Sequence, residues 1–172
     1  AEQRQLELVR GEVSLDSNPD DTRPFYIDTR IGPLTTLNGQ LLLRENNQGL
    51  LLAVRRGEVT LFPTSASPRQ VHSGETVQVG ANGSVHAVAL HSDPWGWTDG
   101  VLSVQQMPLG EFVAELARYR PGLLRCAPEV ANLKVSGTYQ LADTAQILQL
   151  LTRSLPVRVD YKTRYWVSIG AA

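Results

Sequence analysis

The sequence predicts a mainly β protein that ends in a small α+β domain, and three observations support this. The first ninety or so residues contain short segments of alternating apolar and polar residues between Asn-, Gly- and Pro-rich turns. After residue 100, segments with helical spacing of apolar residues appear between strands. The charge also changes: residues 1–99 carry 8 Arg and no Lys against 12 acidic residues, and residues 100–172 carry 8 basic against 5 acidic residues. We therefore expect two modules, residues 1–94 and residues 95–172.

In the first module, each expected strand lies between two turn signals. Asn38-Gly39 and the Asn46–Gly49 segment are typical of tight hairpin turns, because Asn and Gly tolerate a positive φ. The Pro- and Asp-containing segment 17–21 is typical of a loop. Strands are expected around Leu6 and Leu8 and at residues 12–15, 25–29, 40–44, 50–54, 58–62, 75–79 and 85–89.

A short string repeats within this module. The sequence from Arg10 to Leu15, RGEVSL, recurs from Arg56 to Leu61 as RGEVTL, and a third Gly-Glu pair occurs at Gly74. Each glycine is expected to adopt a positive φ before a strand. Regular turn–strand units of this kind favour either a solenoid-like stack or a sandwich of short strands.

The second module is expected to contain two related strand–helix–strand units. In the first helix, residues 110–120, apolar residues recur at helical spacing after Pro108. In the second helix, residues 143–154, Asp143 is the expected N-cap. Strands are expected at residues 101–104, 123–126, 133–139, 157–161 and 165–169. The resulting order is strand, helix, strand, twice, with one strand appended, which is typical of a small α+β unit.

Composition and motifs argue against several function classes. The net charge of −1 argues against binding of nucleic acid or another polyanion. The single Cys126 excludes an intrachain disulfide and a Cys-based zinc cage. His72, His86 and His91 show no metal-site spacing, and Asp20-Asp21 is explained by its loop. Phosphate-binding, HExxH and GxSxG motifs are absent. We expect no catalytic residues, no cofactor and no metal.

Two segments of the second module resemble the secretin/TonB short N-terminal module. They are residues 101–109 with the helix 110–120, and residues 135–139 with the second helix. The first module resembles the periplasmic β region of FecR-type anti-sigma regulators, which include PupR-like proteins. Matching pieces are residues 23–29, 57–59 and 73–75, and the resemblance continues from Trp95 through residues 108–109 to 115–119. Together these segments cover nearly the whole chain.

The FecR resemblance implies a role in cell-surface signalling. Proteins of that family have a cytoplasmic anti-sigma segment, one membrane helix and a periplasmic region. The periplasmic region receives a signal from the N-terminal signalling domain of an outer-membrane, TonB-dependent siderophore transporter, and the signal controls an extracytoplasmic-function sigma factor. We expect this chain to be the periplasmic portion of such a single-pass inner-membrane protein in a Gram-negative bacterium. Contact with the sigma factor and with the membrane is then expected only through segments outside this chain.

Two other function classes compete with this interpretation. The same small α+β fold could act as an envelope or secretin-associated structural module that assembles into rings. The β module could bind carbohydrate, although its aromatic content is low for sugar stacking. The resemblance does not distinguish a ferric-pseudobactin from a ferric-citrate system.

We expect the second module to supply much of the partner-binding surface. Its small sheet exposes strand edges that can pair with another chain, and its excess of basic residues suits an acidic partner. The candidate partner-binding residues are Val104, Gln106, Met107, Arg118, Arg120, Lys162 and Arg164. Trp95 and Trp97 are candidates for the junction between the modules, where core packing of at least one ring is the alternative.

Overall fold

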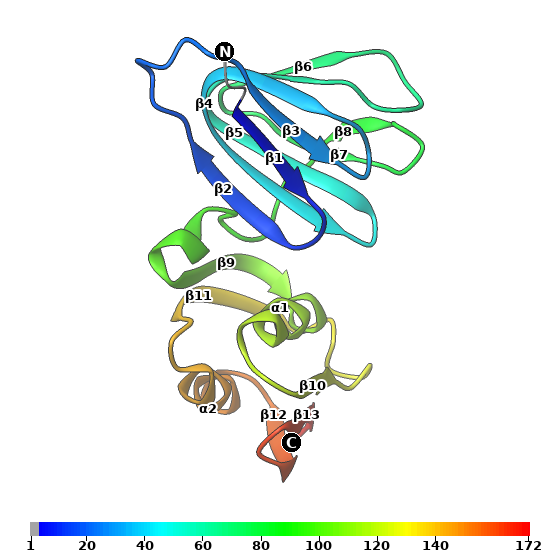
Figure 1. Cartoon of the computed structure of the whole chain (residues 1–172). Helices are drawn as coiled ribbons and strands as arrows, with labels where there is room; N and C mark the ends of the chain where they lie inside the picture. The colour runs from blue at the N-terminus through cyan, green and yellow to red at the C-terminus, as the bar shows by residue number, and fades with distance from the viewer. Residues whose placement is uncertain (1–3) are drawn as a thin grey trace. The chain divides into compact units, whose positions relative to one another are not determined.

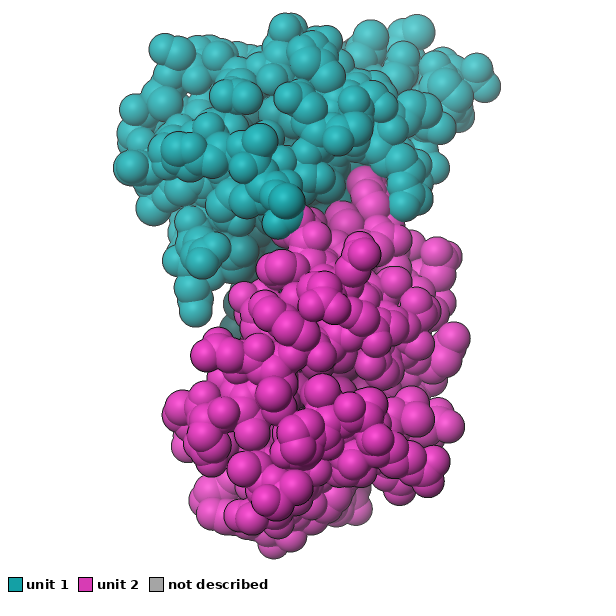
Figure 2. Space-filling model, turned by 180° about the vertical axis from the view of Figure 1, so that it is seen from behind, with its two compact units in different colours: residues 1–89 teal, residues 90–172 magenta. Residues whose placement is uncertain are grey.

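The order of strands and helices along the chain follows the sequence-based prediction closely. Figure 1 shows the computed structural model, which describes residues 4–172. The chain forms two units, residues 1–89 and residues 90–172 (Figure 2). The division therefore falls after residue 89, whereas the sequence predicts it after residue 94. A mainly β fold with an α+β portion is confirmed.

All the regular secondary structure in the described part of the first unit is β-strand. They are β1 (Arg4–Leu8), β2 (Glu12–Asp16), β3 (Phe25–Thr29), β4 (Leu34–Asn46), β5 (Gly49–Leu61), β6 (Arg69–His72), β7 (Thr76–Val79) and β8 (Val85–Ala87). β4 and β5 are the longest, and they pair antiparallel along almost their whole length. These two strands organise the unit because every other strand attaches to them, directly or through one neighbour.

β4 and β5 each take part in two halves of the sheet. Residues 34–36 of β4 pair with β3, and residues 40–44 pair with β2. Residues 50–53 of β5 pair with β7, and residues 58–61 pair with β6. β1 adds parallel to β3, and β8 adds antiparallel to β7. Side chains from both halves form one core, so the unit is a sandwich of short strands. Of the two predicted alternatives, a solenoid-like stack and a sandwich of short strands, the structure therefore has the sandwich, since consecutive repeats do not stack on one another.

The two halves meet where β4 and β5 bend. The pairing register of the two strands shifts between Thr36 and Gly39 and again between Gln40 and Leu41. The buried Ser17 hydroxyl donates to the Gly39 carbonyl at 3.0 Å and accepts from the Gly39 N–H at 2.6 Å. The buried Thr36 hydroxyl donates to the Glu58 carbonyl at 2.8 Å. These bonds satisfy backbone groups that the register shift removes from the ladder.

The bend corrects two details of the prediction. Asn38-Gly39 was expected to form a tight hairpin turn but lies within β4. Residues 50–54 and 58–62 were expected to be two strands, but β5 runs continuously through both, and Gly57 stays in the ladder opposite Gly39 despite its positive φ. β6 was not predicted, since its sequence, RQVH, has one apolar side chain, the buried Val71. Gly11, Gly57 and Gly74 all have positive φ, as the repeat predicts.

The second unit follows the predicted order. Its elements are the short 3-10 helix η1 (Gly96–Asp99), β9 (Val101–Pro108), α1 (Leu109–Leu116), the 3-10 turn η2 (Ala117–Tyr119), β10 (Leu123–Cys126), β11 (Lys134–Gln140), α2 (Thr144–Ser154), β12 (Val157–Thr163) and β13 (Trp166–Ala171). The Asp143 carboxylate caps α2 by accepting from the Gln146 N–H at 2.9 Å. The repeated strand–helix–strand order is confirmed.

Two small sheets and both helices share one core in this unit. β9 pairs antiparallel with β11, while β13 lies between β10, to which it is parallel, and β12, to which it is antiparallel. Phe112 of α1 is fully buried and meets the ring of Tyr139 edge-on at a centroid distance of 5.0 Å. Among residues 4–172, no helix has both the length and the apolar character that crossing a bilayer requires.

Candidate docking surface

The three-stranded sheet of the second unit has one face in the core and one face in solvent. Leu124, Val167 and Val157 are buried against the core from its three strands. Neighbouring residues along each strand point to opposite faces, so the alternate positions face outward. Register places Leu123 beside Trp166, Arg125 beside Ser168, Ser168 beside Asp160, and Gly170 beside Arg158. We call this set, together with Lys162, the open face; its members are Leu123, Arg125, Arg158, Asp160, Lys162, Trp166, Ser168 and Gly170.

The open face is shallow along its central strand. Ser168 and Gly170 of β13 carry almost no side chain, and a methyl group placed on Gly170 would meet no atom within 4 Å. Longer side chains rise on both neighbouring strands, from Arg125 on β10 and from Arg158 on β12. Because strands in a sheet lie about 4.8 Å apart, β10 and β12 are separated by about 10 Å. The face is therefore a shallow trough about as wide as one additional polypeptide segment.

Apolar surface gathers at one end of this trough. Trp166 is 42% exposed and Leu123 is 39% exposed, which is high for residues of this size. The ammonium group of Lys162 lies 4.5 Å from the centroid of the Trp166 ring. In the adjoining turn, the guanidinium group of Arg164 lies 4.5 Å from the ring of Tyr165. Both rings are thus paired with cations, an arrangement that fixes the long basic side chains.

The charges of the open face do not balance. Asp160 forms an ion pair with Arg158 at 3.0 Å. Arg125 and Lys162 form no ion pair with any residue in the described range 4–172. The face therefore has two basic side chains in excess, and these are exposed to solvent.

Three of the predicted partner-binding residues gather at the hairpin between β12 and β13. Lys162 lies on the open face, and Arg164 lies in the turn that follows. Arg120 reaches the same turn, since its guanidinium group donates to the Arg164 carbonyl at 3.2 Å. These three positions form one basic region of the surface.

The other predicted residues have different surroundings. Val104 and Met107 are 6% exposed and belong to the core, so this placement replaces their predicted role as surface contacts. Gln106 is exposed between them, with a φ of 51°, and its N–H donates to the Ser136 hydroxyl at 2.9 Å. Arg118 pairs with Glu115 one turn earlier, at 2.7 Å.

Trp95 and Trp97 both lie in the second unit. Trp95 immediately precedes η1 and is 8% exposed, and Trp97 lies within η1 and is half-buried. The Asp93 carboxylate accepts from the Trp95 N–H at 3.0 Å, and the Trp95 carbonyl accepts from the Thr98 hydroxyl at 2.7 Å. Trp95 is thus buried, but it belongs to neither hydrophobic core cluster, so its role at the junction stays a prediction.

Sequence reasoning missed most of the open face. Leu123, Arg125, Trp166 and Ser168 lie on segments that were expected to be strands, Gly170 directly follows one, and none of the five was named as a candidate. Their alternation with buried residues is visible in the sequence. What the sequence does not give is the pairing of β10 with β13 across more than forty residues, and only that pairing places the five on one surface.

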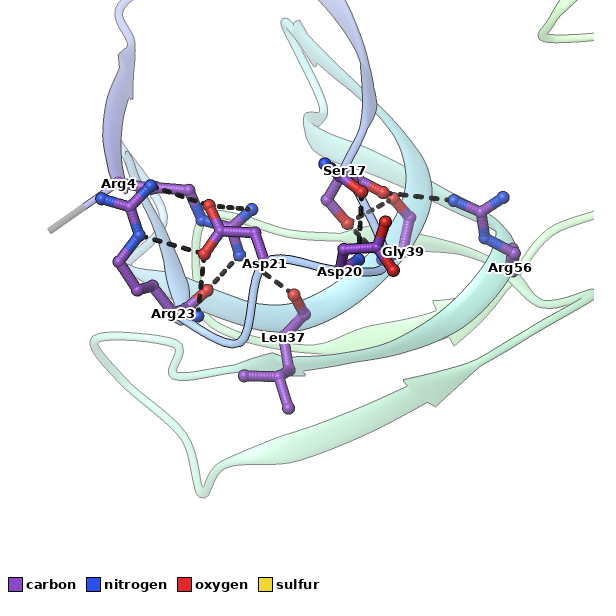
Figure 3. A network of polar contacts seen from close by, with 9 residues as sticks. Arg4, Ser17, Asp20, Asp21, Arg23, Leu37, Gly39 and Arg56 are labelled. Carbon is purple, nitrogen blue, oxygen red and sulfur yellow. Dashed lines mark hydrogen bonds and ion pairs between the residues drawn. The ribbon is translucent and has the colours of Figure 1, made fainter.

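The first unit contains a second group of polar contacts, around Asp21 (Figure 3). The Asp21 carboxylate accepts from the Arg23 guanidinium at 2.8 Å and from the Arg23 N–H at 3.0 Å. Arg4 of β1 lies 3.6 Å from Asp21 and donates to the carbonyls of Arg23 and Leu37. The hydrogen bonds from Arg23, and then the charges of Arg23 and Arg4, hold the pKa of Asp21 well below its usual range. This group ties β1 to the loop before β3.

Neither group resembles a catalytic or metal centre. Burial, and then the charge of Glu129, raise the pKa of the Cys126 thiol, which disfavours the reactive thiolate. No cluster of three His, Cys, Asp or Glu side chains suited to a metal ion occurs among residues 4–172. What the open face offers chemically is a set of exposed cations, a stacked indole ring and a shallow floor, which suits binding of another chain.

Comparison with known proteins shows the fold. No protein-family model matches the sequence, and no curated protein matches it. Two crystal structures of a proposed anti-sigma factor from Parabacteroides distasonis ATCC 8503 match the structure. The 1.65 Å structure has a TM-score of 0.71 at 18% identity, and the 2.50 Å structure a TM-score of 0.70 at 19% identity. Each match covers 95% of this chain and 78% of the other. This chain therefore has the fold of that protein across both of its units.

Proposed function

We propose that this chain is the periplasmic signal-receiving region of an anti-sigma regulator of the FecR type. The observation that carries the proposal is the match to the Parabacteroides distasonis structures, because it extends over 95% of the chain and so includes both units. The sequence resemblance supports the same assignment independently. In this proposal the first unit is the FecR-like juxtamembrane part, and the second unit is the short N-terminal module.

The proposed partner is the N-terminal signalling domain of an outer-membrane, TonB-dependent siderophore transporter. A relay between proteins needs exposed binding surface and no reaction chemistry. The second unit supplies such surface in its open face and in β12, which has a sheet partner on one side only. The sigma factor and the inner membrane would be contacted by other segments of a longer protein, which itself would lie in the envelope of a Gram-negative bacterium.

Calorimetry with purified partners tests this function. The full chain would be titrated with the signalling domains of the TonB-dependent transporters encoded in the same genome. We expect one of them to bind with a standard one-to-one stoichiometry, and residues 1–89 alone to lose that binding. Binding to none of the domains would contradict the proposal. Ring-shaped oligomers of the chain, seen by electron microscopy, would instead favour an envelope assembly module.

A further inference from the structure

We propose that the open face of the β10–β13–β12 sheet is the docking site for an acidic segment that carries at least one exposed apolar side chain. The inference rests on the proposed function, because it takes the transporter signalling domain as the protein that presents this segment. It goes further by naming the surface and the chemistry of what binds there.

The charges of the open face favour an acidic partner. The one carboxylate of the open face, Asp160, is already paired with Arg158. Arg125 and Lys162 lie on opposite outer strands, one on each side of the shallow floor. A segment that lies along the trough would therefore pass between two cations that lack a carboxylate partner in the described chain. Carboxylates on that segment would complete both pairs, which favours an acidic partner and speeds its encounter.

The apolar end of the trough favours a partner with an exposed apolar side chain. Trp166 and Leu123 are adjacent in register and keep about two fifths of their surface exposed. Trp is enriched among the residues that dominate binding energy at protein interfaces. The ring is held in place by Lys162, so little freedom would be lost when a partner side chain packs against it. An apolar residue on the partner would bury this surface.

The shape of the trough leaves its floor open to an approaching peptide. The floor of the trough is formed by Ser168 and Gly170, and the space above Gly170 is empty to at least 4 Å. No helix of this unit covers the floor, because α1 and α2 pack in the core on the other face. A peptide backbone can thus approach the sheet closely.

A lipid surface is the competing binder for a region that combines aromatic and basic residues. Trp166 and Tyr165 are both exposed near the hairpin between β12 and β13, with Lys162 and Arg164 stacked on their rings. Arg125, however, lies away from the hairpin, on β10, beyond the shallow floor. This separation of the cations across a trough favours an extended protein segment over a lipid surface.

Two substitutions on the full chain test the docking site. Arg125→Glu reverses a charge at the rim. Gly170→Glu adds bulk and negative charge on the floor, where there is room for a side chain and where the backbone does not need glycine. We expect each to weaken binding of the signalling domain about tenfold or more. The matched control for Gly170→Glu is Gln149→Glu, which adds the same single negative charge at an exposed position of α2 and should leave affinity unchanged.

The outcomes separate the inference from the function on which it rests. If the unsubstituted chain binds a signalling domain and both face variants bind equally well, the docking site is refuted and the function stands. If the unsubstituted chain binds none of these domains, both are refuted. Vesicles of three parts phosphatidylethanolamine to one part phosphatidylglycerol form the last arm. Binding to them that is lost in Arg125→Glu, without loss of signalling-domain affinity, would assign the face to lipid.

Discussion

Gly11 and Gly57 occupy the same place in the two copies of the Arg-Gly-Glu string but meet different surroundings. Both have positive φ, 97° and 83°. A side chain at Gly11 would meet nothing within 4 Å, whereas one at Gly57 would collide with the backbone carbonyl of Asn38. The repeat therefore predicts the backbone conformation of both residues. It does not predict the close approach of β4 and β5, because that depends on the bend of the whole sheet.

The difference leads to a prediction for the two alanine variants. Gly11→Ala should cost about 1–2 kcal/mol, the usual penalty for an L-residue in the left-handed region. Gly57→Ala should cost clearly more, about 3 kcal/mol or above, since it adds a collision with backbone that cannot move aside. Urea unfolding followed by far-UV circular dichroism measures both. Equal losses for the two variants would show that the bend at Gly57 is more compliant than the structure indicates.

At the scale of the element, β1 is held to its surroundings by several polar side-chain contacts. It is an edge strand with one sheet neighbour, β3, and its first residue, Arg4, is held by Asp21 and by the ring of Phe25. Gln5 adds a hydrogen bond to Asp28 at 2.8 Å. Since the folded state lowers the pKa of Asp21, the ionised carboxylate stabilises the fold.

This coupling predicts a pH-dependent effect of Asp21→Asn. The stabilisation by Asp21 is fully present above the ordinary carboxyl pKa near 4, and it declines as the pH falls toward the lower pKa of the folded state. The variant should therefore melt at a lower temperature than the parent at pH 7, and the gap should narrow progressively below pH about 4. Thermal melts by far-UV circular dichroism at several pH values test this. A gap that is constant with pH would show that the carboxylate does not act through its charge.

The elements also show which features a sequence can predict. The helices and β10 were expected at nearly their observed positions, because apolar spacing, Pro108 and the Asp143 cap are local signals. β6 was not predicted because it contributes only one buried side chain and is defined by its pairing with β5. Of the basic residues on the open face, only Lys162 was a predicted candidate; Arg120 and Arg164, also predicted, lie at the adjoining turn. The floor of the open face was not predicted, because only the pairing register places Ser168 and Gly170 there.

At the scale of the whole molecule, each unit contains its own core. One cluster draws only on residues of the first unit, and the other only on residues 102–169. With the boundary after residue 89, the first unit carries 8 basic against 10 acidic residues and the second carries 8 basic against 7 acidic residues. Their separate cores also explain why the change in sequence pattern after the first ninety residues could be recognised at all.

Separate cores predict that residues 90–172 fold alone. Trp95, Trp97 and Trp166 are the three tryptophans of the chain, so tryptophan fluorescence reports on this unit only. We expect the fragment to unfold cooperatively in urea, so that its tryptophan fluorescence changes in one sharp transition, as for a folded domain. The companion fragment, residues 1–89, has no tryptophan and serves as the control by far-UV circular dichroism. A fragment that binds hydrophobic dye and lacks a sharp transition would contradict this prediction.

The long strands β4 and β5 have a consequence for how the first unit is degraded. Each strand passes through both halves of the sandwich, so a protease cannot excise one half and leave the other with its strands intact. A cut within β4 or β5 would interrupt a strand that pairs in both halves of the sandwich. Proteolysis of this unit should accordingly be all-or-none, passing from intact domain to short peptides without a stable half-domain remnant.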